Sequence, residues 1–167
     1  LGASALLFYL FAYAFMNVGA FAILIAVSRF DSSAEGGETL NDLAGLAARK
    51  PWLAAAMTLF MLSLAGVPPL VGFLAKLNVF SAAVQAGLAW LAVFGVVNSV
   101  ISAYYYLRVV GVMYMKQGQP AEGTASPVCL ALQVGVGLAA VATVVLGLWP
   151  GLILDLARLS AIALMGG

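Results

Sequence analysis

Residues 63–76 read SLAGVPPLVGFLAK, in which a glycine and a proline pair interrupt apolar sequence that ends in a lysine. Pro68 and Pro69 cannot donate a backbone N–H, and Gly66 favours irregular backbone, so the hydrogen-bond ladder of a helix fails here. Inside a membrane, the freed carbonyls are tolerated only where they are buried in protein or line a water-filled cavity. This stretch therefore predicts a broken membrane helix of the kind found at transporter ion sites. A kink that only serves packing is the alternative.

Lys76 is the single charged residue between Lys50 and Arg108. A lysine at membrane depth costs about 3 kcal/mol on insertion scales, so it is normally kept for ion or proton handling. Burial disfavours its charged form and a nearby carboxylate or water chain favours it, so its surroundings can switch its proton affinity. These properties favour a proton relay. The alternative is snorkelling, in which the long side chain carries the ammonium to the membrane interface.

The composition identifies an integral membrane protein. Hydrophobic residues make up 65% of the chain and charged residues 8%, whereas a soluble domain carries about 25% charged residues. Four runs without charge are long enough for spanning helices, which need about 20 apolar residues. We therefore predict one all-α, polytopic unit over residues 1–167, with about four spans and the second one broken. The predicted spans cover about residues 5–28, 52–80, 88–114 and 128–154.

The distribution of basic residues predicts an orientation. Five Lys or Arg residues lie in or beside residues 29–51 and 115–127, against one at the other ends of the spans. By the positive-inside rule these two loops are cytoplasmic.

Several functional classes are excluded or disfavoured by what the chain contains. Arg49-Lys50 is the only basic cluster, so we expect no nucleic-acid partner. The chain has one cysteine and no histidine, which is the commonest transition-metal ligand. We therefore expect no metal and no bound cofactor in this chain.

Polar residues inside the spans provide further candidates for a proton path. No carboxylate lies inside a predicted span, so an acidic partner of Lys76 must come from elsewhere. The residues spaced to share one helix face are Tyr13 and Asn17 in the first span and Asn98, Ser102 and Tyr105 in the third. Each set either lines a wetted polar axis or forms interhelical hydrogen bonds, and the spacing leaves both readings open.

Three runs carry a resemblance to a known family. They are FYLFAYAFMNVGAFA at residues 8–22, the stretch at 63–76, and YYYLR at 104–108. Together they resemble the antiporter-like membrane subunits of respiratory complex I, and within that group the subunit N of bacterial NADH-quinone oxidoreductase, whose mitochondrial counterpart is NADH dehydrogenase subunit 2. The resemblance covers essentially the whole chain but only the C-terminal part of such a subunit. The start at Leu1 is likewise interpreted as that of a piece of a longer polypeptide.

The resemblance implies a larger fold of about fourteen spans, with two inverted repeats that each hold one broken helix. It implies that Lys76 belongs to a chain of buried ionisable groups that translocates protons in the bacterial inner membrane. The partners implied are the N-terminal part of the same subunit, other membrane subunits of complex I and the lipid bilayer. Flavin, iron–sulfur clusters and quinone are expected in other subunits.

Two departures and two alternatives accompany this expectation. Related antiporter-like subunits place a histidine before the break, and this chain has none. The first repeat, with its own lysines and glutamate, is also absent from this sequence.

The first alternative is a cation/proton antiporter subunit of the Mrp type, which would work without NADH. The second is a structural membrane anchor in which Lys76 only pairs with a neighbouring subunit.

Overall fold

The computed structural model describes residues 2–30, 40–116 and 129–151. Within these ranges the chain is helical and no strand occurs, which confirms the predicted all-α class. The helices are α1 (Gly2–Phe30), α2 (Leu46–Arg49), α3 (Pro51–Ala65), α4 (Val71–Gln85), α5 (Ala89–Met115) and α6 (Leu130–Leu148).

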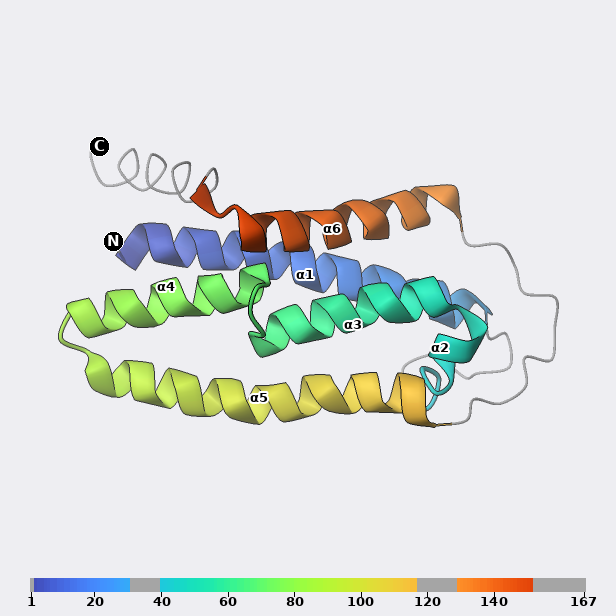
Figure 1. The fold of residues 1–167 in the computed structure, drawn as a ribbon, viewed down its shortest axis with the longest axis horizontal. Helices are drawn as coiled ribbons and strands as arrows, with labels where there is room; N and C mark the ends of the chain where they lie inside the picture. The colour runs from blue at the N-terminus through green and yellow to red at the C-terminus, as the bar shows by residue number, and fades with distance from the viewer. Residues whose placement is uncertain (1, 31–39, 117–128, 152–167) are drawn as a thin grey trace.

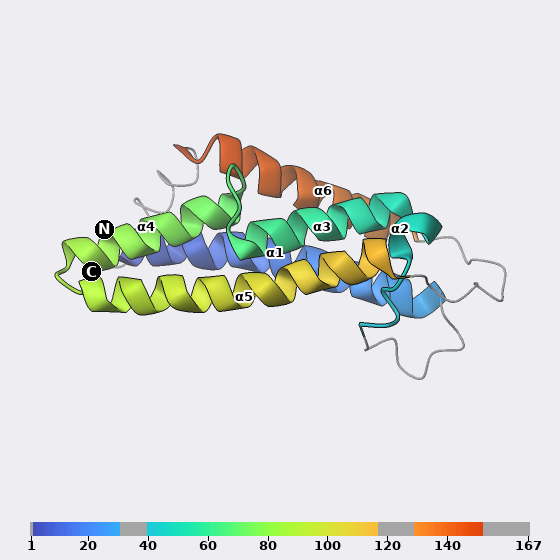
Figure 2. The same ribbon diagram turned by 60° about the horizontal axis from the view of Figure 1, so that its bottom comes forward.

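The long helices form an elongated bundle in which α3 and α4 follow one another along the long axis (Figure 1). Helix α1 packs against α3, α4 and α6, and α5 packs against α3 and α4. The second view shows the same order, with the α3–α4 break near the middle of the bundle (Figure 2). The ends of α3 and α4 at the break therefore pack against other helices, whereas Val67, Pro68 and Pro69 of the connection are exposed.

Three helices, α1, α5 and α6, are long and apolar enough to cross a membrane. Helices α3 and α4 are apolar but have only 15 residues each. At 1.5 Å per residue each half is about 22 Å long, so neither crosses a hydrocarbon core of about 30 Å alone, but the two in series do. The broken span predicted from the sequence is thus the α3–α4 pair. Helix α6 ends at Leu148, before Pro150, and residues 152–154 of the predicted last span lie outside the described residues.

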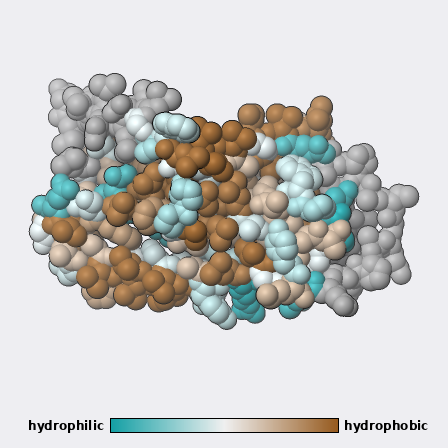
Figure 3. All heavy atoms as spheres, in the orientation of Figure 1, coloured by the Kyte–Doolittle hydropathy of each residue, from teal (hydrophilic) through white to brown (hydrophobic). Residues whose placement is uncertain are grey.

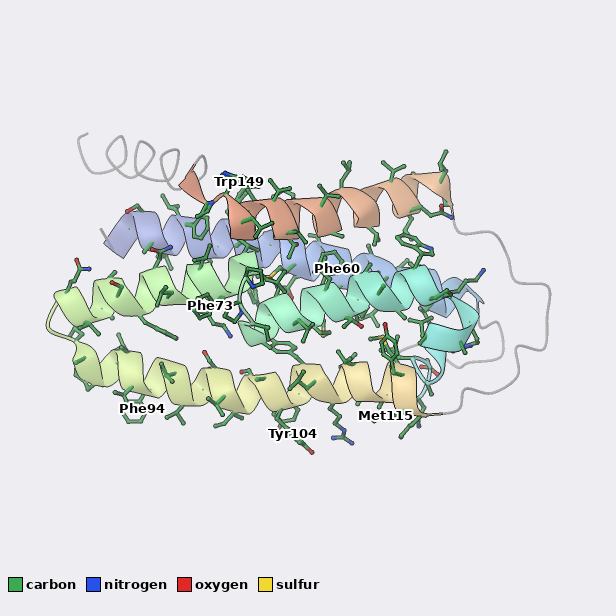
Figure 4. The ribbon with its side chains drawn as sticks, in the orientation of Figure 1. Phe60, Phe73, Phe94, Tyr104, Met115 and Trp149 are labelled. Atoms are coloured by element: carbon green, nitrogen blue, oxygen red, sulfur yellow. The ribbon has the colours of Figure 1, made fainter. Side chains whose placement is uncertain are left out.

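Large apolar side chains form the interior of the bundle. Phe8, Ile23, Leu53, Phe60 and Met113 are completely or almost completely buried. Phe60 points from α3 toward α1, where Gly19 leaves room for its ring, because a Cβ at that glycine would overlap the ring. Figure 4 shows Phe60 between these two helices.

The outer surface is also apolar. Phe94 and Tyr104 on α5 are 68% and 65% exposed and point away from the bundle (Figure 4). Hydrophobic side chains spread over much of the face seen in Figure 3. Apolar surface on this scale indicates contact with lipid or with other protein.

The segments next to residues 31–39 and 117–128 lie at the same end of the bundle (Figure 1). The two loops predicted to be cytoplasmic therefore start from one side. That this side is the cytoplasmic one stays a prediction.

Gly66 ends α3 in the left-handed conformation, with φ 91° and ψ 40°. Its N–H is shared between the carbonyls of Leu62 and Ser63, and the N–H of Val67 also bonds Leu62. This is the Schellman pattern that glycine favours at helix ends.

We expect Gly66→Ala to lower the free energy of unfolding by roughly 1–2 kcal/mol, because a Cβ disfavours the left-handed conformation. The midpoint temperature of thermal inactivation of the assembled membrane complex should fall accordingly, compared at one heating rate. Gly111→Ala, at a helical site where a Cβ meets nothing within 4 Å, is the control. Equal midpoints for the two variants would contradict the prediction.

Candidate functional site

The C-terminal end of α3 exposes carbonyl groups, and Lys76 binds them. The last four carbonyls of any helix lack a partner within that helix. At the end of α3 the Schellman pattern satisfies those of Leu62 and Ser63, so those of Leu64 and Ala65 remain. Lys76 Nζ donates to the Leu64 carbonyl oxygen at 2.8 Å and to that of Ala65 at 3.3 Å. The ammonium therefore lies at the negative end of the α3 dipole, where a cation is stabilised.

The direction of the Lys76 side chain follows from helix geometry. Lys76 is the sixth residue of α4, and the Cα–Cβ bonds of a helix tilt toward its N-terminus. The side chain thus runs back to the break. In this structure the ammonium is not carried toward the far end of α4, as snorkelling would require.

The N-terminus of α4 is held by α3 in return. The N–H of Gly72 donates to Ser63 Oγ at 3.1 Å, and Ser63 is completely buried. Gly72 allows this approach, because a Cβ there would overlap the Ser63 carbonyl oxygen. Each half of the broken helix thus supplies a side chain that binds the open end of the other half. We call the five residues Ser63, Leu64, Ala65, Gly72 and Lys76 the helix-break contact.

Helix α6 packs against part of the connection between the two halves. Gly147 of α6 lies against the backbone of residues 69–71, and a Cβ at this glycine would overlap that backbone. Pro68 and Pro69, which were predicted to break the helix, are in this connection.

A polar cavity of about 200 Å³ opens beside Lys76, between α1, α3, α4 and α5. It has room for several water molecules, and its polar groups supply the hydrogen-bond partners that buried water needs. The polar residues that line it are Tyr9, Tyr13, Ser63, Lys76, Asn98, Ser99, Ser102 and Tyr106.

The structure divides the predicted polar axis between two cavities. Tyr13, Asn98 and Ser102 line the cavity of Lys76. Asn17 and Tyr105 instead line a neighbouring, mainly apolar cavity of about 360 Å³ between α1, α3 and α5. The two cavities share Leu64 and Tyr106. Asn17 and Tyr105 do not line the Lys76 cavity, so the structure does not bring them to Lys76.

Sequence reasoning missed four polar residues of the Lys76 cavity: Tyr9, Ser63, Ser99 and Tyr106. Tyr9 lies one helical turn before Tyr13, and their rings stack with centroids 5.8 Å apart. Tyr106 similarly follows Ser102 by four residues, so the spacing rule that selected Tyr13 and Ser102 also pointed to these two. Nothing in the sequence singled out Ser63 as a binding group.

Acidic residues are scarce in the part of the chain that the structure describes. Asp42 is the one carboxylate there, and no carboxylate of the described ranges lines the Lys76 cavity. No cluster of three or more His, Cys, Asp or Glu residues occurs in those ranges. That this chain binds no metal or cofactor stays a prediction.

Comparison with known proteins agrees with the resemblance seen in the sequence. The family model described as NADH:quinone oxidoreductase/Mrp antiporter, TM, matches residues 1–102. NADH-quinone oxidoreductase subunit N of Trichlorobacter lovleyi is 46% identical over 160 residues, which are 94% of this chain and 31% of the relative. Subunit N of Chloroflexus aggregans is 45% identical over 166 residues, which are 99% of this chain and 33% of the relative.

A solved structure shows the same fold. A chain of respiratory complex I from Thermus thermophilus with bound aureothin superposes with a TM-score of 0.73 at 34% identity, covering 92% of this chain and 34% of that one. The chain described here spans about a third of the length of the relatives it matches. The family match, the sequence relatives and the fold agree, and the chain belongs to the NADH:quinone oxidoreductase/Mrp antiporter family of membrane proteins.

Proposed function

We propose that this chain is the C-terminal part of a proton-translocating membrane subunit of NADH-quinone oxidoreductase, with Lys76 as a proton relay. Energy from quinone reduction, which takes place in other subunits that hold flavin and iron–sulfur clusters, would change the proton affinity of Lys76. The chain would lie in the bacterial inner membrane with residues 29–51 and 115–127 on the cytoplasmic side. Its partners would be other membrane subunits of complex I, lipid, and the N-terminal part of the same subunit.

The observation that carries this proposal is the position of the Lys76 ammonium between the end of α3 and a polar cavity. Two of its three N–H groups suffice for the carbonyls of Leu64 and Ala65, and one remains for the cavity that Lys76 lines. A neutral amine still has two N–H groups for the same carbonyls. Lys76 can therefore gain or lose one proton toward the cavity while it keeps both contacts to α3.

The opposing influences on the ammonium also suit a relay. Partial burial in the bundle disfavours its charge, whereas the carbonyl end of α3 stabilises it. Neither influence involves a fixed carboxylate among the described residues of the cavity. Its protonation state would therefore respond to hydration and to neighbouring charges.

Two other functions share parts of this site. An antiporter subunit of the Mrp type is included in the matched family, but the relatives reported above are subunits of NADH-quinone oxidoreductase. Co-purification of the full-length subunit with flavin and iron–sulfur subunits would decide between the two. A structural anchor would make the same contacts to Leu64 and Ala65, so only a test of titration separates it from a relay.

Lys76→Arg supplies that test. Arginine keeps a positive charge and several donors for the α3 carbonyls, but it releases its proton roughly a thousandfold less readily than lysine. We expect the rate of proton pumping to fall at least about tenfold, since 1.4 kcal/mol on the barrier to proton release already gives that factor in rate. The measurement uses membranes that carry the full-length subunit, with assembly verified on the same samples.

The control is Lys116→Arg, an equivalent exchange at the exposed residue after α5. It should pump like the parent. Normal pumping by assembled Lys76→Arg would show that Lys76 serves as an anchor or an ion-pair partner and would remove the proposed mechanism.

A further inference from the structure

Ser63 makes a different hydrogen bond from three other hydroxyl residues of the described helices. Thr58, Ser102 and Thr143 each donate to the carbonyl four residues earlier in their own helix, which is the usual bond of a serine or threonine inside a helix. Ser63 instead accepts the N–H of Gly72 across the break, at 3.1 Å. It is also completely buried, so this bond is shielded from lipid and from bulk solvent.

The Ser63–Gly72 bond lies directly beside the contacts of Lys76. Ser63 immediately precedes Leu64 and Ala65, whose carbonyls accept the ammonium. Gly72 lies four residues before Lys76, which places both on the same face of α4, one turn apart. Three hydrogen bonds, all donated by α4 and accepted by α3, thus connect the last turn of α3 with the first turns of α4. A shift of α4 that breaks the Ser63–Gly72 bond also moves Lys76 relative to its carbonyls.

The chemistry of the hydroxyl suits this place in the fold. As an acceptor, Ser63 satisfies one of the N–H groups that the start of α4 leaves without a helical partner. The hydroxyl retains its own proton as a donor, and Ser63 lines the same cavity as Lys76. One side chain therefore holds the two half-helices together and adds a polar group to the Lys76 cavity.

We propose that Ser63 is a positioning residue for Lys76. It fixes the first turn of α4 against α3, so that the ammonium stays on the Leu64 and Ala65 carbonyls with one N–H left for the cavity. This inference rests on the proposed function, because it assigns to Ser63 a part in proton translocation through Lys76.

The test compares Ser63→Ala with Ser63→Thr in the full-length subunit within the assembled complex. The readout is the initial rate of proton pumping, normalised to the amount of assembled complex. For Ser63→Ala we expect a decrease of roughly fivefold to tenfold, the size expected for losing one buried hydrogen bond. Ser63→Thr keeps Oγ and should pump close to the parent. Thr58→Ala, which removes a hydroxyl from the same helix but no bond across the break, is the matched control and should also pump normally.

Every outcome decides the question. Parent-like pumping by Ser63→Ala, or a failure of assembled Ser63→Thr to restore pumping, overturns the proposal. If Ser63→Ala does not assemble, Ser63→Cys supplies a slightly larger side chain with a weaker acceptor and must show a reduced pumping rate, whereas a parent-like rate overturns the proposal. Failure of both Ser63→Ala and Ser63→Cys to assemble makes Ser63 a folding residue and overturns it as well.

Lys76→Arg in the same membranes separates this inference from the proposed function. If Lys76→Arg loses pumping and Ser63→Ala retains it, only the role of Ser63 fails. If Lys76→Arg pumps normally, the relay itself fails.

Discussion

Replacing Lys76 by methionine is expected to abolish proton pumping and to destabilise the complex at the same time. Methionine is unbranched and apolar and fits irregular space, so it removes the proton carrier with little change of shape. It also leaves the carbonyls of Leu64 and Ala65 without their donor. Each unsatisfied buried carbonyl costs about 1–3 kcal/mol. Proton pumping, NADH–quinone turnover and thermal inactivation, measured on the same membranes, would show both effects.

The stability effect distinguishes this variant from Lys76→Arg, which keeps donors for the α3 carbonyls. Leu77→Met is the control, because Leu77 is the next residue of α4 and is 50% exposed. It should leave pumping and stability unchanged. If Lys76→Met pumped like the parent, neither the charge nor the proton of Lys76 would be needed. Loss in Lys76→Met with normal pumping in Lys76→Arg would assign Lys76 an electrostatic role without titration.

The helix break and the polar surroundings of Lys76 could be predicted, because an interrupted helix and a lysine are both energetically unfavourable inside a membrane unless their polar groups find partners. Pro68 and Pro69 cannot continue the hydrogen-bond ladder, and a lysine at membrane depth needs polar surroundings. The sequence also showed that carbonyls before the break need partners. It did not show that Lys76 is the partner, because that depends on the end of α3 at Gly66 and on the course of a side chain back toward the break.

The polar axis was predicted less well, for a geometric reason. Helical spacing states which residues of one helix share a face, but not which neighbouring helix or cavity that face meets. Asn98 and Ser102 therefore belong to the Lys76 cavity, whereas Tyr105 of the same predicted set lines the apolar cavity beside it. Asn17 donates to the carbonyl of Tyr13 in its own helix at 2.8 Å. Packing between α1, α3 and α5 decides this division.

Close contacts between half-helices explain why Ser63 escaped prediction. A serine in an apolar helix usually bonds within that helix, and its sequence neighbours give no sign of another partner. The relevant signal is Gly72, which permits the approach of α4 to Ser63. A glycine in an apolar helix has several ordinary readings, so the pairing of these two residues appears only in the structure.

Gly72→Ala is expected to prevent normal packing of the helix break. A Cβ at this position would overlap the carbonyl oxygen of Ser63. This oxygen belongs to the backbone, so it cannot move aside by itself as the end of a flexible side chain can. Helices α3 and α4 would have to separate, which weakens the bond from Gly72 to Ser63 and withdraws Lys76 from its carbonyls. Overpacking of a tight interior costs about 1–3 kcal/mol, and the lost contacts add to it. We therefore expect little assembled complex, measured by native electrophoresis with NADH dehydrogenase staining.

Gly111→Ala again provides the comparison, because a Cβ on that part of α5 meets nothing within 4 Å. There, alanine should be tolerated or slightly favourable, since it is the better helix former by about 1 kcal/mol. The contrast between two identical exchanges in apolar helices isolates the close approach at the break from the general effect of a methyl group. If Gly72→Ala assembled and pumped like the parent, α4 would not need to touch the Ser63 carbonyl, and the helix-break contact would not be what holds Lys76 in place.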